Sequence, residues 1–193
     1  MGRNVGVMAE ARCIIFDLDG TLIDSDRALI EPFLQLGVPL GEVTFGHPVR
    51  SECERLGFSV EEYLAAYDAE SVQPFPGVAE MLDALARWSI CSNKARTSGL
   101  AELRRLGWAP ETAWFAEDFG WQAKELTPVL DALGVAPEEV CFVGDTAHDQ
   151  QCAVEVGCRF AWAGWNPRTL AASPEGVVLA RPGDLFDLVD LRG

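Results

Sequence analysis

Positive charge is scarce in this chain of 193 residues. Only two lysines occur, Lys94 and Lys124, and the formal net charge is −15 at pH 7. No basic tract interrupts this acidic balance, so the composition argues against binding to nucleic acid or to an anionic membrane surface. A site for an anionic ligand would need its own local positive field, and each lysine is therefore worth locating.

Long apolar runs and closely spaced cysteines are also missing. No apolar segment approaches the roughly 20 residues that span a bilayer, and Met1 to Arg12 contain no apolar stretch typical of a secretory signal. The six cysteines include no Cys-x-x-Cys pair, which argues against a zinc knuckle or a thioredoxin-type site. We therefore expect a cytoplasmic protein with buried, free thiols, whose oligomeric state stays open.

Short apolar runs alternate with helical patterns along most of the chain. The runs predict buried strands at Cys13–Phe16, Trp88–Cys91, Ala113–Phe115, Val140–Val143 and Arg159–Trp162. They are continuous rather than alternating, as in strands covered on both faces. Helical patterns lie at Gly77–Arg87, Thr97–Leu106, Lys124–Leu133 and Ala147–Val156. The order of elements predicts an α/β fold with a doubly wound (Rossmann-like) parallel sheet.

One segment departs from this alternation. Residues 23–76 contain no strand-like run and instead show three helical patterns, at Ser25–Leu36, Pro48–Leu56 and Val60–Glu70. Glycine- and proline-containing loops separate these patterns. We predict a core domain of residues 1–22 and 77–193, with residues 23–76 forming a small helical cap inserted after the first strand.

Two carboxylates follow the first predicted strand directly. Asp17 and Asp19 belong to the run Asp-Leu-Asp-Gly-Thr, in which Gly20 allows the backbone to turn. Ligands of open α/β sheets bind outside the carboxyl ends of the strands. Two neighbouring anions are unfavourable unless a cation or a proton compensates them. The pattern therefore favours a functional site over the alternative, an acidic turn exposed to solvent.

Further polar groups follow other predicted strands. Ser92 and Asn93 come after Trp88–Cys91, and Asp145 and Asp149 come after Val140–Val143. Lys124 lies between these two groups, at the start of a predicted helix. Carboxylates, a hydroxyl and a lysine at one sheet edge suit magnesium-assisted phosphoryl transfer, because Mg²⁺ prefers oxygen ligands and the lysine stabilises phosphoryl oxygens. An aspartate can act as the nucleophile.

The run from Ile14 to Ser25 resembles motif I of the haloacid dehalogenase-like hydrolase superfamily, and the chain is similar to its phosphoglycolate-phosphatase-like branch. Ser92-Asn93 resembles motif II, Lys124 motif III, and Gly144-Asp145-x-x-x-Asp149 motif IV. The resemblance spans residues 11 to about 165, with the motifs in the family's order.

The resemblance implies a role for each matched residue. Asp17 would attack phosphorus and form an aspartyl-phosphate, and Asp19 would act as general acid and then general base. Phosphate would be held by Ser92, by the backbone near Asn93 and by Lys124. Mg²⁺ would be bound by Asp17, Asp145 and the backbone carbonyl of Asp19, with Asp149 supporting its ligand shell.

Asp19 separates two reactions of this superfamily. A halide leaves without a proton, whereas an alkoxide requires one, and the family's dehalogenases lack an aspartate at this position. We therefore expect a Mg²⁺-dependent phosphatase that acts on a small phosphorylated metabolite. A phosphomutase acting on a sugar phosphate is the alternative. A signalling receiver domain is disfavoured because its acidic pair precedes a phosphorylated aspartate on a different strand.

The roles of some candidate residues stay open. Lys94 either attracts an anion to the site or is a solvated charge, and His148 more plausibly faces solvent. Substrate specificity is expected to reside in the cap, where the candidates are Glu31, Arg50, Glu54, Arg55 and Tyr63.

Overall fold

A computed structural model describes residues 11–44 and 47–188 of the chain. Our expectation about a secretory signal concerns mostly residues outside these ranges. Within them, no helix combines the length and the apolar character needed to cross a membrane. All six cysteines are buried and free, as predicted.

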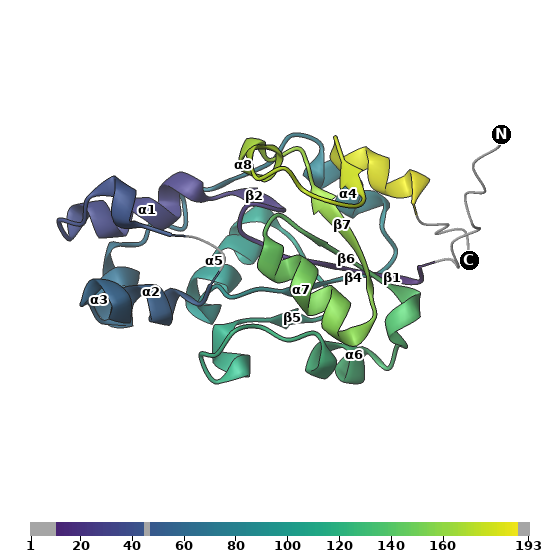
Figure 1. Cartoon of the computed structure of the whole chain (residues 1–193), viewed down its shortest axis with the longest axis horizontal. Helices are drawn as coiled ribbons and strands as arrows, with labels where there is room; N and C mark the ends of the chain where they lie inside the picture. The colour runs from purple at the N-terminus through teal and green to yellow at the C-terminus, as the bar shows by residue number, and fades with distance from the viewer. Residues whose placement is uncertain (1–10, 45–46, 189–193) are drawn as a thin grey trace.

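A six-stranded sheet forms the centre of the molecule (Figure 1). Its order is β5-β4-β1-β6-β7-β8, and every pair of neighbours is parallel. The strands are β1 (Cys13–Phe16), β4 (Trp88–Cys91), β5 (Ala113–Trp114), β6 (Val140–Gly144), β7 (Arg159–Ala163) and β8 (Val178–Leu179). The chain adds strands on one side of β1 and then on the other, so the topology switches at β1. This confirms the predicted doubly wound α/β fold.

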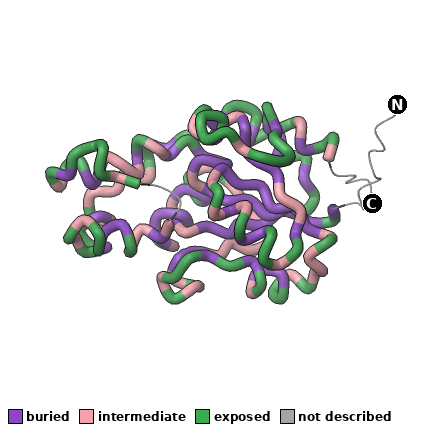
Figure 2. The backbone as a smooth tube through the Cα atoms, viewed as in Figure 1, coloured by how far each residue is buried: buried purple, intermediate pink, exposed green. Residues whose placement is uncertain are grey.

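Helices cover both faces of the sheet, which explains the continuous apolar strands. Residues of α4 (Val78–Ala84) and α5 (Arg96–Leu106) pack with Ile14, Phe16 and Ile90 on one face. On the other face, α6 (Thr127–Leu133) and α7 (Ala147–Val156) pack with Ile15 and Phe142. Figure 2 shows the buried backbone concentrated in the central strands. Successive strand residues point to opposite faces, so each strand contributes to both clusters.

Three α-helices form a separate lobe at one end of the molecule (Figure 1). The helical lobe comprises α1 (Asp26–Gln35), α2 (Val49–Leu56) and α3 (Val60–Ala66). It has its own cluster of buried side chains, which includes Phe33, Cys53 and Tyr63. A short antiparallel ribbon of β2 (Ile23–Asp24) and β3 (Gln73–Pro74) joins it to the sheet domain. The three helices lie within the predicted insertion, and the domain boundaries stay a prediction.

The structure corrects several predicted elements. Lys124 does not start a helix, because α6 begins at Thr127, with Pro128 in its first turn where proline is favoured. The predicted helix Val60–Glu70 ends at Ala66. The sequence also gave no sign of β2, β3 and β8, which have two residues each. The helix α8 (Pro167–Ala171) was not predicted either.

Candidate active site

The carboxyl ends of three neighbouring strands bring the candidate residues together. Asp17 follows β1, Ser92 follows β4, and Asp145 follows β6. Because β1 lies between β4 and β6, these positions meet where the strand order reverses, which is the usual ligand-binding edge of such sheets. A pocket opens there between the sheet and the helical lobe. The residues that line it include Asp17, Asp19, Ser92, Asn93, Lys94 and Lys124.

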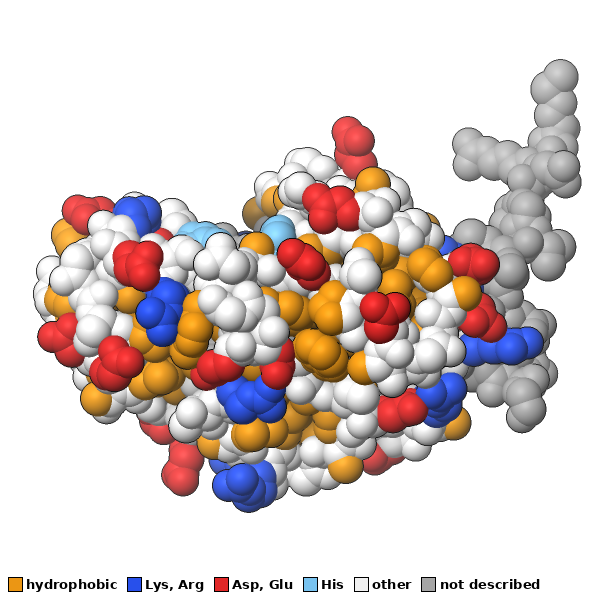
Figure 3. Space-filling view, turned by 90° about the horizontal axis from the view of Figure 1, so that it is seen from below, with side chains coloured by type: hydrophobic (Ala, Val, Ile, Leu, Met, Phe, Trp, Pro, Cys, Tyr) orange, Lys and Arg blue, Asp and Glu red, His pale blue; other side chains and the backbone are white. Residues whose placement is uncertain are grey.

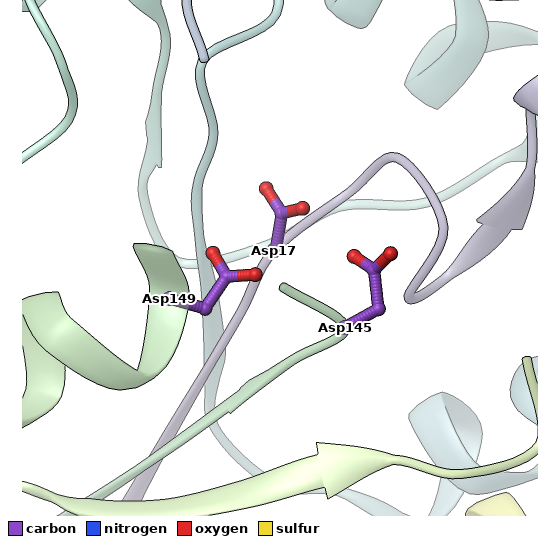
Figure 4. A group of neighbouring side chains, drawn as sticks. All are labelled: Asp17, Asp145 and Asp149. Carbon is purple, nitrogen blue, oxygen red and sulfur yellow. The ribbon is translucent and has the colours of Figure 1, made fainter. Parts of the chain in front are cut away.

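Three buried carboxylates converge beside the end of β1. Asp17, Asp145 and Asp149 each place one oxygen within 4.8 Å of the others. Figure 4 shows the three side chains reaching toward a common space from β1, from the end of β6 and from α7. Burial, opposed by Lys124 and assisted by the neighbouring carboxylates, raises the pKa of Asp17 to about 6. Burial and the neighbouring carboxylates raise the pKa of Asp145 well above its usual range. The cluster is therefore suited to a compensating cation.

The donor set fits a hard divalent ion. Three carboxylates supply oxygen ligands of the kind that Mg²⁺ and Ca²⁺ prefer. Asp145 is held by Thr21, whose hydroxyl donates to Oδ1 at 3.2 Å, and by Arg168, whose Nη2 lies 2.7 Å from Oδ2. Gly20 adopts a φ of +76°, and a Cβ there would lie 2.4 Å from Asp145 Oδ2. A side chain at position 20 would therefore displace the carboxylate of Asp145.

Lys124 lies between two members of the cluster. Its Nζ is 2.7 Å from Asp17 Oδ1 and 2.5 Å from Asp149 Oδ1. Burial alone would lower the pKa of Lys124, but the carboxylates of Asp149 and Asp17 outweigh this effect and raise it well above the usual value. Thr146 orients Asp149, since its backbone N–H and hydroxyl donate to Oδ2 at 2.9 and 2.6 Å. Lys124 thus remains charged beside Asp17.

The carboxylate of Asp19 lies outside this cluster and faces the other lysine. Lys94 Nζ is 2.8 Å from Asp19 Oδ1. The Lys94 side chain is only 3% exposed, so its interpretation as a solvated charge is wrong. Asp17 and Asp19 each have a lysine of their own, and the acidic chain thus places both of its lysines in this pocket.

Ser92 and Asn93 occupy the side of the pocket next to β4. Ser92 is buried and its hydroxyl oxygen accepts a bond from the Lys94 backbone N–H at 3.3 Å. The side-chain oxygen of Asn93 accepts a 2.8 Å bond from the backbone N–H of Lys124. Asn93 therefore holds the loop that carries Lys124 in place, although this loop is not helical.

The helical lobe lines the pocket with both apolar and polar side chains, and most of the specificity candidates are not among them. Of these candidates only Tyr63 lines the pocket. Arg55 instead pairs with Glu52, and Arg50 stacks on the ring of Trp121 at 4.5 Å. His148 lies in α7, is half-buried, does not line the pocket, and has its Nε2 3.6 Å from Cys152 Sγ.

Several residues near the site were not predicted, and four of them hold its charged side chains. They are Thr21, Tyr67, Glu102 and Arg168. Asn166 and Arg168 come shortly after the end of β7. Polar residues that follow a strand are a signal from which Arg168 could have been predicted. Glu102 had no such signal, because a glutamate in a helical pattern normally faces solvent.

Comparisons with known proteins found a matching family model, similar sequences and similar solved structures. The family model described as haloacid dehalogenase-like hydrolase matches residues 14–163. A phosphoglycolate phosphatase from Aquifex aeolicus is 30% identical, covering 93% of this chain and 97% of the relative. The pyrophosphatase PpaX from Halalkalibacterium halodurans is 26% identical, covering 95% and 99%. A crystal structure of a Lactobacillus plantarum protein has a TM-score of 0.76 at 21% identity, covering 93% of this chain and 100% of that one.

Proposed function

The chain belongs to the haloacid dehalogenase-like hydrolase family, and we propose that it is a Mg²⁺-dependent phosphatase acting on a small phosphomonoester. The observation that carries the proposal is the division of charge in the pocket. Asp17 contacts Lys124 and lies in the carboxylate cluster, whereas Asp19 contacts Lys94 outside it. Two carboxylates in different surroundings suit two different roles, a nucleophile and a general acid–base.

The reaction would proceed in two displacements at phosphorus. In the first, an oxygen of Asp17 bonds to phosphorus, the bond to the ester oxygen breaks, and Asp19 donates its proton to that leaving oxygen. In the second, Asp19 takes a proton from water, the water oxygen bonds to phosphorus, and the bond to Asp17 breaks. Inorganic phosphate and the free alcohol are the products, and both carboxylates return to their starting states.

The remaining residues would stabilise the charge that spreads over the phosphoryl oxygens. Lys124 lies beside Asp17, and Ser92 and the backbone near Asn93 supply hydrogen-bond donors at the same edge. A bound Mg²⁺, held by Asp17, Asp145 and the backbone carbonyl of Asp19 with Asp149 in support, would offset the negative charge of the phosphoryl group.

Asp19 also favours phosphate esters over haloacids as substrates. An alkoxide leaving group needs a proton, and Asp19 lines the pocket beside Asp17 to supply it. The names of two relatives, a phosphoglycolate phosphatase and a pyrophosphatase, point the same way. The helical lobe would act as the cap that encloses the substrate, since Phe33 and Tyr63 of this lobe line the pocket.

The first test is turnover of phosphorylated metabolites by the purified protein. A panel that includes p-nitrophenyl phosphate, phosphoglycolate and pyrophosphate, assayed with Mg²⁺, should release free phosphate from at least one compound. Release of an isomerised sugar phosphate instead would indicate a phosphomutase. Chelation of the metal should abolish turnover.

The nucleophile is tested by Asp17→Asn, which should reduce kcat by at least about 10³-fold because the amide cannot form the acyl phosphate. The matched control is Asp24→Asn, which alters an exposed aspartate of β2 and should keep wild-type activity. Full activity of Asp17→Asn would show that the assigned nucleophile is wrong.

A further inference from the structure

Lys94 lies at the centre of a buried polar network on the side of the pocket away from the carboxylate cluster. Its Nζ is 2.8 Å from Asp19 Oδ1 and 3.1 Å from Glu102 Oε1, and it donates to the Tyr67 hydroxyl at 2.7 Å. An ammonium group has three N–H donors. Hydrogen bonds to Asp19 and Tyr67 use two of these donors, and an ion pair with Glu102 engages the ammonium group further. The ammonium group is thus already occupied by partners within the protein.

The two lysines of the chain thus face different partners. Lys124 contacts Asp17 and Asp149, whereas Lys94 contacts Asp19. A charged hydrogen bond to one carboxylate oxygen restricts rotation of that carboxyl group, and so directs its other oxygen. A carboxylate that transfers protons depends on such orientation, because the transfer requires the donor and acceptor oxygens within hydrogen-bond reach.

Glu102 and Tyr67 in turn hold Lys94. Glu102 belongs to α5 and its side chain is fully buried, which is rare for a carboxylate and unfavourable unless it is paired. The Tyr67 hydroxyl donates to Glu102 Oε1 at 2.5 Å, and the Tyr67 ring lies 4.6 Å from Lys94 Nζ. Tyr67 directly follows α3, so the network links the helical lobe to the sheet domain.

We propose that Lys94 is a positioning residue that orients Asp19 for proton transfer, and that Tyr67 and Glu102 hold it in place when the helical lobe is seated. This proposal rests on the proposed phosphatase function, in which Asp19 protonates the leaving group. It assigns Lys94 to the leaving-group side of the reaction, whereas Lys124 serves the phosphoryl side.

Leaving-group dependence tests the proposal. Lys94→Met keeps an unbranched side chain of nearly the same length and removes the ammonium group. For an alkyl phosphate, whose alkoxide needs a proton, kcat/KM should fall by about 10²-fold. For p-nitrophenyl phosphate, whose phenolate leaves without one, the fall should be smaller by about tenfold or more. Lys94→Arg should restore part of the loss on the alkyl ester.

Tyr67→Phe removes only the hydroxyl and should produce the same dependence on the leaving group with a smaller loss, about three- to tenfold on the alkyl ester. The matched control is Arg87→Met, which breaks an exposed ion pair with Glu111 at the opposite end of β4. It should alter neither substrate's kcat/KM. Circular dichroism will show whether Lys94→Met folds. If it does not, the test uses Tyr67→Phe and the double variant Lys94→Met/Glu102→Gln. The double variant removes both buried charges.

Two outcomes would overturn the proposal. An equal loss on both esters, or a rise in KM with kcat unchanged, would show that Lys94 binds phosphate rather than positioning Asp19. Wild-type kinetics in Lys94→Met would show that it has no part in the reaction. Failure of the proposed function is recognised separately, because wild-type protein would then release no phosphate, or Asp17→Asn would retain activity.

Discussion

Two carboxylates of this site lie in surroundings that disfavour their ionised form. Burial raises the pKa of Asp17 to about 6, and the pKa of Asp145 is also raised by burial and by the neighbouring carboxylates. Lys124 opposes the shift at Asp17, and Arg168 does so at Asp145. Ionised carboxylates in such positions destabilise the fold, and a cation bound among them would remove much of that cost.

The effect of metal on stability follows from this arrangement. Mg²⁺ at about 100 times its dissociation constant should stabilise the wild-type protein by about 2.7 kcal/mol and raise its melting temperature. Asp145→Asn should lose most of that shift, while its melting temperature without metal should not fall below that of the wild type, because a buried carboxylate is replaced by a neutral amide. Calorimetry with and without Mg²⁺ measures both quantities.

Asp131→Asn is the matched control for this prediction, since Asp131 is exposed on α6. It should keep the full Mg²⁺-dependent shift. An undiminished shift in Asp145→Asn would mean that Asp145 is not a ligand.

Individual site residues differ in how far the sequence could predict them. Asp17 and Asp145 directly follow apolar runs, so their placement at one sheet edge follows from strand order alone. Lys94 also follows such a run, but its burial depends on Glu102 of α5 and on Tyr67 of the helical lobe. Contacts of that kind are set by tertiary packing, which no local pattern records.

Among the elements of the helical lobe, α2 carries a buried carboxylate. Glu52 of α2 is 4% exposed and accepts hydrogen bonds from Arg55, from the backbone and side chain of Thr44, and from His47. Burial by itself would raise the pKa of Glu52, but these hydrogen bonds outweigh it and hold the pKa at about 2. Glu52 thus ties α2 to the segment that precedes it.

The lowered pKa predicts how the stability of the lobe depends on pH. The pKa of Glu52 in the folded protein, about 2, lies below the ordinary glutamate pKa of 4.5. Its ionised form therefore adds stability above pH 4.5, and this contribution is lost as the pH falls from 4.5 toward 2. Glu52→Gln should therefore lower the unfolding free energy by about 2 kcal/mol at pH 7. The difference from the wild type should shrink as the pH is lowered.

Urea unfolding curves at several pH values give these differences. Glu54→Gln changes an exposed glutamate of the same helix and should leave stability within about 0.5 kcal/mol at every pH. A pH-independent loss in Glu52→Gln would mean that packing, not charge, is responsible.

The sequence predicted elements well where apolar runs were long enough. The strands β1, β4 and β6 each have four or five buried residues and were located to within one residue. The strand β8 has two residues, and its pairing with β7 depends on the tertiary fold rather than on a hydrophobic run. The start of α6 was misplaced because periodicity extends backward to Lys124, whereas the loop there is held by Asn93.

The whole molecule is acidic, but its pocket holds both of its lysines. The net charge is −15, and Figure 3 shows acidic side chains spread over both the helical lobe and the sheet domain on the face in view. Lys94 and Lys124 are buried within the pocket and each is paired with carboxylates. These carboxylates therefore cancel most of the positive field of the two lysines. An approaching anion meets mainly the negative field of the surface.

This charge distribution predicts an unusual salt dependence. Raising the ionic strength from about 0.02 to 0.2 M at constant Mg²⁺ should increase kcat/KM for a dianionic phosphate ester by about two- to fivefold, because salt screens the repulsion between the substrate and the surface. The value of kcat should hardly change, since the bound substrate is shielded from bulk ions. The double variant Asp131→Asn/Glu155→Gln, which removes two exposed charges, should show a weaker dependence. Initial-rate kinetics over a KCl series measure the effect, and a decrease of kcat/KM with salt would show that the field of the pocket, not that of the surface, governs substrate capture.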